Sequence, residues 1–257
     1  MKILIGLLLL GPGLALADSP FDGTWKTRVD TIKQTGKPDV LVVAHDMYRC
    51  ESCVPQIKVK ADGSDQAVTG HAYYDTVAAK IVSSSSIEIT NKKAGKTTLT
   101  VAYSVTDDGN TLNGKFTDFT GAQPVTGNFT EKRVAAGPAG ANKVSGSWKA
   151  DKISDIGDAG TTLTYAMGAD SLKMSSNGVN YDAKFDGKDY PMSGDPGNTM
   201  VSLKHLGSHT VQETDKRDGK VTDVVHSSVS KDGKSLHVVD EDKIHGVRTS
   251  YTMEKQS

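Results

Sequence analysis

The sequence predicts an all-β protein made of two tandem small antiparallel meander β-barrels. Three observations predict this fold class: the chain repeats itself, each copy contains short alternating runs about ten residues apart, and turn signals separate the runs. Short strands at this spacing, without an amphipathic helix, indicate an antiparallel meander, and closing the meander into a barrel removes its exposed edges.

The internal repeat is visible without a gap. Residues 186–237 align with residues 62–113 when shifted by 124 positions, and 18 of the 52 paired positions are identical. A repeat of this length has to be interpreted before any other feature of the sequence. The chain is therefore a tandem duplication, and we expect two domains.

The ends of the copies are marked by recurring short segments. Gly23-Thr24-Trp25-Lys26 recurs as Gly146-Ser147-Trp148-Lys149, and Thr130-Glu131-Lys132 recurs as Met253-Glu254-Lys255. Between the copies lies a stretch rich in small residues, which is typical of a linker. The predicted domains are residues 18–133 and 144–257, joined by a linker over residues 134–143.

The first seventeen residues have the pattern of a secretory signal peptide. Met1-Lys2 is followed by the apolar run Ile3 to Leu10, and Ala15-Leu16-Ala17 is a small-x-small cleavage site. The apolar run is well under the roughly 20 residues that span a bilayer. We expect residues 1–17 to be removed and the protein to be periplasmic or secreted.

Composition and motifs exclude several classes of function. The 30 basic and 31 acidic residues are interspersed, which argues against nucleic acid and anionic membrane surfaces as partners. The sequence contains no His-Glu-x-x-His, Gly-x-Ser-x-Gly, P-loop or dinucleotide motif, so we expect no enzyme activity and no cofactor.

Alternation within each copy predicts the strands. Residues 98–105 alternate with a period of two, which places the side chains of Leu99, Val101, Tyr103 and Val105 on one face. The Asp-Gly pairs that end at Gly109 and Gly233 follow such runs at equivalent places in the two copies. Asp-Gly between alternating runs predicts a hairpin turn.

Gly-x-Trp at the start of an antiparallel meander, present twice, resembles the lipocalins and fatty-acid-binding proteins, the calycins. The segment Asp186-Gly187-Lys188-Asp189-Tyr190-Pro191, followed by Gly194-Asp195-Pro196, resembles a motif of bacterial exported lipocalin-like proteins. The resemblance implies that Trp25 and Trp148 close the barrel bases under basic residues of the last strands. These would be Lys132 or Arg133 for Trp25, and Lys255 for Trp148.

Both cysteines lie in the first copy, at Cys50 and Cys53. In an oxidising compartment the default for such a pair is a structural disulfide. A redox-active pair and a metal site, with His45 and His71 as the nearby imidazoles, are the alternatives.

Comparison of the two copies gives a candidate ligand site. Ile81, Ile89 and Leu99 of the first copy are replaced by His205, Glu213 and Asp223 in the second. Buried charges must be paired, neutralised or bound, so these three residues, if their strand faces point into the barrel, would hold a polar ligand or, as a second choice, a metal. The alternative is that they lie at the barrel mouth or form an ion pair in solvent.

These features favour an exported, non-enzymatic protein that binds a small apolar or amphipathic molecule, because barrel mouths are common ligand sites. The alternative is a structural or protein-interaction module of the cell envelope with filled barrels. An enzyme would have to rely on His205, Glu213 and Asp223.

Overall fold

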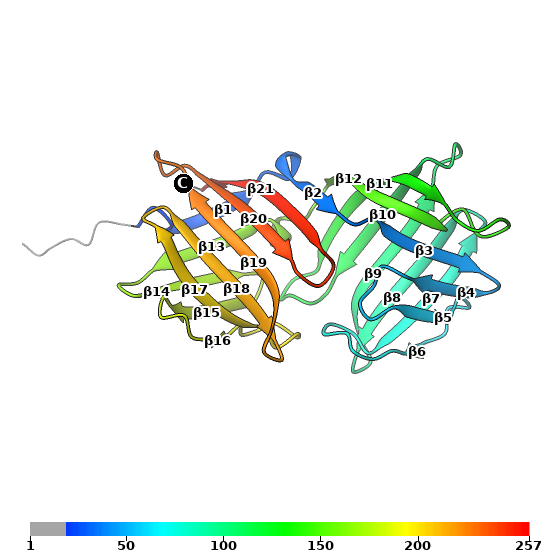
Figure 1. Cartoon of the computed structure of the whole chain (residues 1–257), viewed down its shortest axis with the longest axis horizontal. Helices are drawn as coiled ribbons and strands as arrows, with labels where there is room; N and C mark the ends of the chain where they lie inside the picture. Colours follow the sequence, from blue (N-terminus) through cyan, green and yellow to red (C-terminus); the bar gives the residue numbers. More distant parts are fainter. Residues whose placement is uncertain (1–18, 257) are drawn as a thin grey trace, which may run out of the picture.

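The computed structural model describes residues 19–256, which form two nearly closed antiparallel β-barrels (Figure 1). The predicted all-β class and the two tandem barrels are confirmed. The expected signal peptide, residues 1–17, lies outside the described residues. None of the helices found in residues 19–256 has the length and apolar character needed to cross a membrane.

Each barrel is one continuous sheet. The strands of the first barrel, in spatial order, are β5 (Ile57–Lys60), β4 (Met47–Cys50), β3 (Asp39–Ala44), β12 (Gly146–Ser154), β11 (Val125–Ala136), β10 (Thr111–Asp118), β9 (Lys96–Val105), β8 (Ser86–Lys93), β7 (Thr76–Ser83) and β6 (Gln66–Ala67). A bridge between Asp62 and Lys80 brings the two ends of this sheet together.

The second barrel has the same plan. Its strands, in spatial order, are β15 (Val179–Lys184), β14 (Ser171–Ser176), β13 (Thr162–Met167), β1 (Gly23–Thr27), β21 (Val247–Lys255), β20 (Ser235–Asp242), β19 (Lys220–Val229), β18 (Thr210–Arg217), β17 (Met200–Gly207) and β16 (Tyr190–Pro191). The additional strand β2 (Lys33–Gly36) pairs with β21, and a bridge between Asn180 and Ser193 brings the sheet ends together.

The first strand of each repeat lies in the barrel of the other repeat, an arrangement we call the strand exchange. β1 pairs with β13 and β21, and β12 pairs with β3 and β11. In Figure 1 the blue β1 accordingly lies beside the red β21. The repeat boundaries at 18–133 and 144–257 therefore do not coincide with the barrels. The first barrel is built from the uninterrupted stretch 39–154.

The strand exchange also changes the partners of the two tryptophans. Both indoles are fully buried, and the Arg133 guanidinium lies 3.9 Å from the ring centre of Trp148, while the Lys255 ammonium lies 5.4 Å from that of Trp25. The expected pairing of Trp25 with Lys132 or Arg133, and of Trp148 with Lys255, is wrong. Each tryptophan lies on a strand that pairs within the barrel of the other repeat. Trp148 on β12 therefore contacts Arg133 of β11, and Trp25 on β1 contacts Lys255 of β21.

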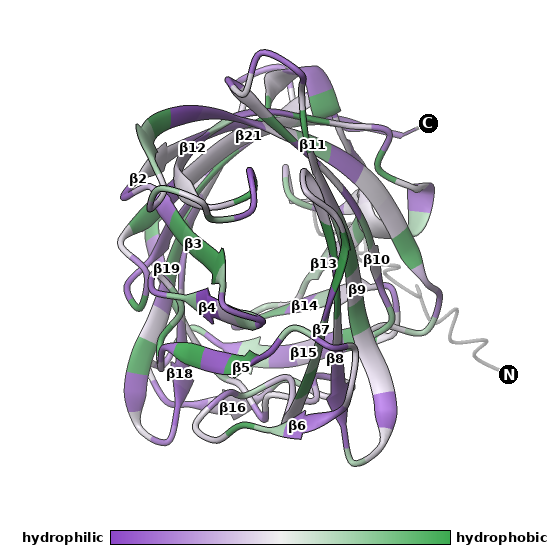
Figure 2. Ribbon diagram, turned by 90° about the vertical axis from the view of Figure 1, so that its right-hand side faces the viewer, coloured by the Kyte–Doolittle hydropathy of each residue, from purple (hydrophilic) through white to green (hydrophobic). Residues whose placement is uncertain are grey.

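The four strands β7 to β10 recur as β17 to β20 with the 124-residue offset of the repeat. In Figure 2 the labelled strands of both barrels carry hydrophilic (purple) as well as hydrophobic (green) residues. In β9, Val101 and Val105 are buried while Ala102 and Ser104 are exposed, as the alternation predicts. The glycine of each predicted Asp-Gly turn has a φ of +70° or more, a conformation that glycine adopts without strain.

Each barrel has one apolar core. The first core consists mainly of Leu41, Val43, Tyr48, Ile57, Val59, Val77, Ile87, Ile89, Val105, Leu112 and Trp148. The second consists mainly of Phe21, Trp25, Tyr165, Leu172, Tyr181, Val201, Leu203, Val211, Val229, Leu236, Val238 and Met253. The core of each barrel includes one tryptophan, and we call the end of the barrel at which this tryptophan lies the base.

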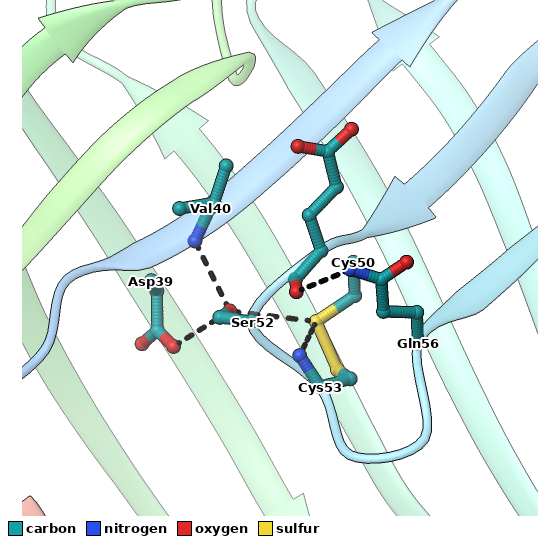
Figure 3. Close-up of a disulfide and its surroundings, with 7 residues drawn as sticks. Asp39, Val40, Cys50, Ser52, Cys53 and Gln56 are labelled. Carbon is teal, nitrogen blue, oxygen red and sulfur yellow. Dashed lines mark hydrogen bonds between the residues drawn. A yellow bond between two sulfur atoms is a disulfide. The ribbon is translucent and has the colours of Figure 1, made fainter. Parts of the chain in front are cut away.

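Cys50 and Cys53 form a disulfide, as predicted (Figure 3). The loop that they close is also tied to β3. The Ser52 hydroxyl donates to the Asp39 carboxylate at 3.1 Å and accepts from the Val40 amide at 3.0 Å. The disulfide therefore fixes a loop that the neighbouring strand already holds.

Replacing both cysteines by serine is expected to lower the free energy of unfolding of the first barrel by roughly 2 kcal/mol, because the disulfide closes only a very short loop. Chemical denaturation of wild type and variant measures the difference. A reductant should destabilise the wild type by the same amount and leave the variant unchanged. Equal stability of the two proteins would mean that the Ser52 bonds alone hold the loop.

Candidate functional site

The loops at the ends of the barrels opposite the bases, which we call the mouths, face each other. The Arg217 guanidinium donates to the Tyr73 hydroxyl at 2.8 Å and lies 4.9 Å from its ring centre. Lys93 Nζ donates to the carbonyl of Pro196 at 2.6 Å, and Asn177 exchanges hydrogen bonds with the loop between β10 and β11. We call the region between the two mouths the junction.

The largest cavity of the junction has a volume of about 640 Å³. It is amphipathic, because the apolar side chains of Val54, Val221 and Ile244 line it together with polar groups. The polar side chains are His71, Tyr73, Tyr74, Lys93, Asn198, Arg217, Asp218, Lys220, Thr222 and His245. Pockets that hold small molecules typically have volumes of about 300–1,000 Å³ and combine an apolar lining with a few polar groups.

Two smaller cavities also lie between the barrels, where β2 approaches β12. One, of about 290 Å³, is lined by Lys37, Asp39, Trp148, Lys149, Asp223, Asp240, Asp242 and His245, among others. The other, of about 370 Å³, is lined mainly by Ile32, Phe129, Glu131, Ile153 and Thr249. Residues of both barrels line each of the three cavities, and His245 is common to the 640 Å³ and 290 Å³ cavities.

The mouth half of the second lumen contains four carboxylates, which we call the acidic cluster: Glu213, Asp215, Asp223 and Asp240. The register of the sheet brings them together. Asp215 lies opposite Asp223, and Val225 lies between Glu213 and Asp240. The Tyr181 hydroxyl donates to Glu213 Oε2 at 2.6 Å.

Burial and mutual repulsion raise the pKa values of the acidic cluster. Burial raises the pKa of Asp215 to about 9, with further contributions from Glu213 and Asp223. Burial, together with Asp223, raises the pKa of Asp240 to about 6. The pKa values of Glu213 and Asp223 are also raised, first of all by burial. Asp215 therefore retains its proton at neutral pH.

Several buried oxygens in this region have no hydrogen-bond partner. They include Asp215 Oδ1, Asp240 Oδ1 and the hydroxyl of Thr222. Thr222 is only 3% exposed and lies next to Asp223 in β19. Because most buried polar groups in proteins are bonded, these atoms leave hydrogen-bonding capacity unused.

The structure brings together two of the three residues singled out from the sequence. Glu213 and Asp223 both belong to the acidic cluster, and Asp223 also lies 3.9 Å from the Arg217 guanidinium. His205 is exposed, and its ring stacks on Phe185 with 3.6 Å between the ring centres. The predicted ligand-binding role of these residues stays a prediction.

Asp215 and Asp240 were missed by sequence reasoning. Their counterparts in the first copy are Asn91 and Phe116 at the same 124-residue offset. Asn91 and Asp215 are both polar, so a comparison that looks for apolar residues replaced by polar ones does not single out this position. Phe116 lies beyond residue 113, where the compared segment ended. Extending the comparison by three residues, within the same strand, identifies Asp240.

No protein-family model matches the chain. No curated protein matches it either. Among solved structures, a crystal structure of a double mutant of the vaccine antigen Transferrin Binding Protein B from Haemophilus parasuis matches with 11% sequence identity and a TM-score of 0.23. The match covers 88% of this chain and 45% of that chain, so the chain corresponds to less than half the length of its structural match.

Proposed function

We propose that the chain is an exported, non-catalytic protein that binds an amphipathic small molecule at the junction of its two barrels. The observation that carries the proposal is the cavity of about 640 Å³ whose apolar and polar lining comes from both mouths. An apolar wall with a few polar groups is the usual composition of a small-molecule site.

The proposed site lies between the two barrels and not inside one of them. Core side chains, among them Trp148 in the first barrel and Trp25 in the second, fill the base of each lumen. The 640 Å³ cavity lies where the mouths meet, so a ligand held there would touch both repeats. Neither barrel alone would form the complete site.

Export is part of the proposal. The signal-peptide pattern of residues 1–17 supports a periplasmic or secreted location, and the Cys50–Cys53 disulfide is typical of an oxidising compartment. A binding function also agrees with the calycin resemblance of the two Gly-x-Trp strands.

A second candidate function is a protein-interaction module of the cell envelope. The observation that favours it is the presence of exposed apolar side chains near the bases, namely Val82, Val134 and Leu206. Exposed apolar side chains on a surface can mark interaction sites when they form a patch.

The direct test is native mass spectrometry of the protein purified from its own host, followed by denaturing extraction. The expected result is one small molecule per chain, recovered with unchanged mass after prolonged incubation with the protein. If the protein has the mass of the bare chain and also does not bind the fluorophore N-phenyl-1-naphthylamine, the proposal is contradicted and the interaction module is favoured.

A bulky side chain in the junction is expected to block binding. Ile244 lines the 640 Å³ cavity and is 38% exposed, so Ile244→Trp would fill part of the volume. We expect this variant to bind the neutral fluorophore N-phenyl-1-naphthylamine at least tenfold more weakly than the wild type. Fluorescence titration measures the difference.

The matched control is Val134→Trp, which adds the same side chain at a 55% exposed position at the base end of β11. It is expected to bind the fluorophore like the wild type. Equal binding by the Ile244 variant would show that the fluorophore binds elsewhere.

A further inference from the structure

We propose that the ligand carries a positively charged organic group, such as an ammonium, and that this group enters the acidic half of the second lumen from the junction. The inference rests on the proposed function and adds the charge of the ligand to it. The apolar part of the same molecule would lie in the 640 Å³ cavity.

The acidic cluster is not required by the fold. The same strand positions in the first barrel hold Ile89, Asn91, Leu99 and Phe116, and that barrel forms with the same strand plan. Replacing apolar core residues by carboxylates costs stability unless the charges are neutralised. The second barrel therefore carries an unfavourable cluster that its sister barrel does without.

Few side-chain cations pair directly with the cluster. Among residues 19–256, one ion pair involves these four carboxylates: the Arg217 guanidinium lies 3.9 Å from Asp223, which is long for an ion pair, and it also donates to Thr199 Oγ1 at 3.0 Å and to the Tyr73 hydroxyl at 2.8 Å. Lys37, Lys149 and His245 line the 290 Å³ cavity beside Asp223 and Asp240 without an ion pair to either carboxylate. Because Asp215 retains its proton, the charge that a ligand would meet lies on the other three carboxyl groups, and Arg217 offsets it only weakly.

The unpartnered oxygens provide an independent indication. Thr222 is buried, its hydroxyl has no hydrogen-bond partner, and the residue lines the 640 Å³ cavity beside Asp223. One carboxylate oxygen each of Asp215 and Asp240 is also enclosed without a partner. A ligand that donates several hydrogen bonds would satisfy acceptors that the protein leaves open.

Access to the cluster comes from the junction. Asp223 and Asp240 line the 290 Å³ cavity, together with Asp242, and His245 connects the lining of this cavity to that of the larger one. Three tyrosines, Tyr165, Tyr181 and Tyr251, belong to the core or pack against it in the same barrel. Carboxylates and aromatic rings together are the groups that bind ammonium ions in proteins.

Two probes with the same decyl chain and head groups of opposite charge test the inference: decylammonium and decyl sulfate, both below their micelle-forming concentrations. Isothermal titration calorimetry of the full mature chain measures both affinities at pH 7.5. We expect the ammonium probe to bind at least tenfold more tightly. In the double variant Asp223→Asn, Asp240→Asn, this preference is expected to disappear.

The control is Asp107→Asn, which removes one negative charge from an exposed turn between β9 and β10 and should keep the preference. Circular dichroism of the double variant checks that it is folded, which we expect because the substitutions relieve repulsion. Equal binding of both probes, or a preference that survives in the double variant, overturns the inference.

The outcomes separate the inference from the proposed function. If both probes bind equally and Ile244→Trp blocks both, the junction site stands and its selectivity for positive charge is wrong. If neither probe binds the wild type, the proposed function fails together with the inference.

Discussion

The substitution Trp148→Ala is expected to destabilise the first barrel by about 3–5 kcal/mol, although Trp148 belongs to the second repeat. The indole is fully buried, donates to the Val144 carbonyl at 2.9 Å and packs under Arg133. Its loss leaves a large cavity at the base of the barrel formed by residues 39–154. Hydrogen exchange should therefore become faster in β3 to β11, while β13 to β21 keep their protection.

Trp25→Ala provides the mirror-image control. Trp25 donates to the Phe21 carbonyl at 2.8 Å and lies in the second barrel near Lys255. Its substitution should release protection in β13 to β21 and spare the first barrel. If each substitution instead destabilised the remainder of its own repeat, the strand exchange would not exist in solution.

The substitution Asp215→Asn is expected to stabilise the second barrel at neutral pH by on the order of 1–3 kcal/mol. Burial raises the pKa of this carboxyl from 3.8 to about 9, with Glu213, Asp223 and Asp240 as its charged neighbours. The folded state therefore binds a proton that the unfolded state releases above pH 4. The stability of the wild type should fall as the pH rises from 4 toward 9.

An asparagine does not ionise, so the variant avoids this loss. It also has a natural precedent, because Asn91 occupies the equivalent position of the first barrel. Denaturation at pH 4, 6 and 8 measures the effect. The two proteins should be nearly equally stable at pH 4 and differ most at pH 8, and Asp107→Asn should follow the wild type throughout. A constant difference across this range would rule out the titration of Asp215 as its cause.

The barrels were predictable from the sequence because they depend on local patterns. Alternation over residues 98–105 and the Asp-Gly turns determine strands and hairpins within a few residues. The strand exchange was not predictable. The segments Gly23-Thr24-Trp25-Lys26 and Gly146-Ser147-Trp148-Lys149 are so similar that either strand fits either barrel. In the structure the chain passes from β1 in the second barrel through β2, which pairs with β21, to β3 in the first barrel.

The acidic cluster was predictable in part and the junction was not. Comparing the copies identifies Glu213 and Asp223, because carboxylates replace apolar residues at lumen positions. The junction depends on two mouths meeting across large distances in the chain. Tyr73 and Arg217, which bond across it, are 144 residues apart and lie in unrelated loops. No local pattern marks such a pair.

The strand exchange gives the two barrels an order of completion when the chain emerges, N-terminus first, into the compartment in which it folds. β1 is made first, yet its neighbours β13 and β21 follow much later, and Trp25 pairs with Lys255 across 230 positions. The first barrel needs nothing beyond residue 154, so it can close while β1 still lacks partners. The second barrel then assembles around the oldest strand of the chain, which until that time presents an open edge to chaperones and proteases.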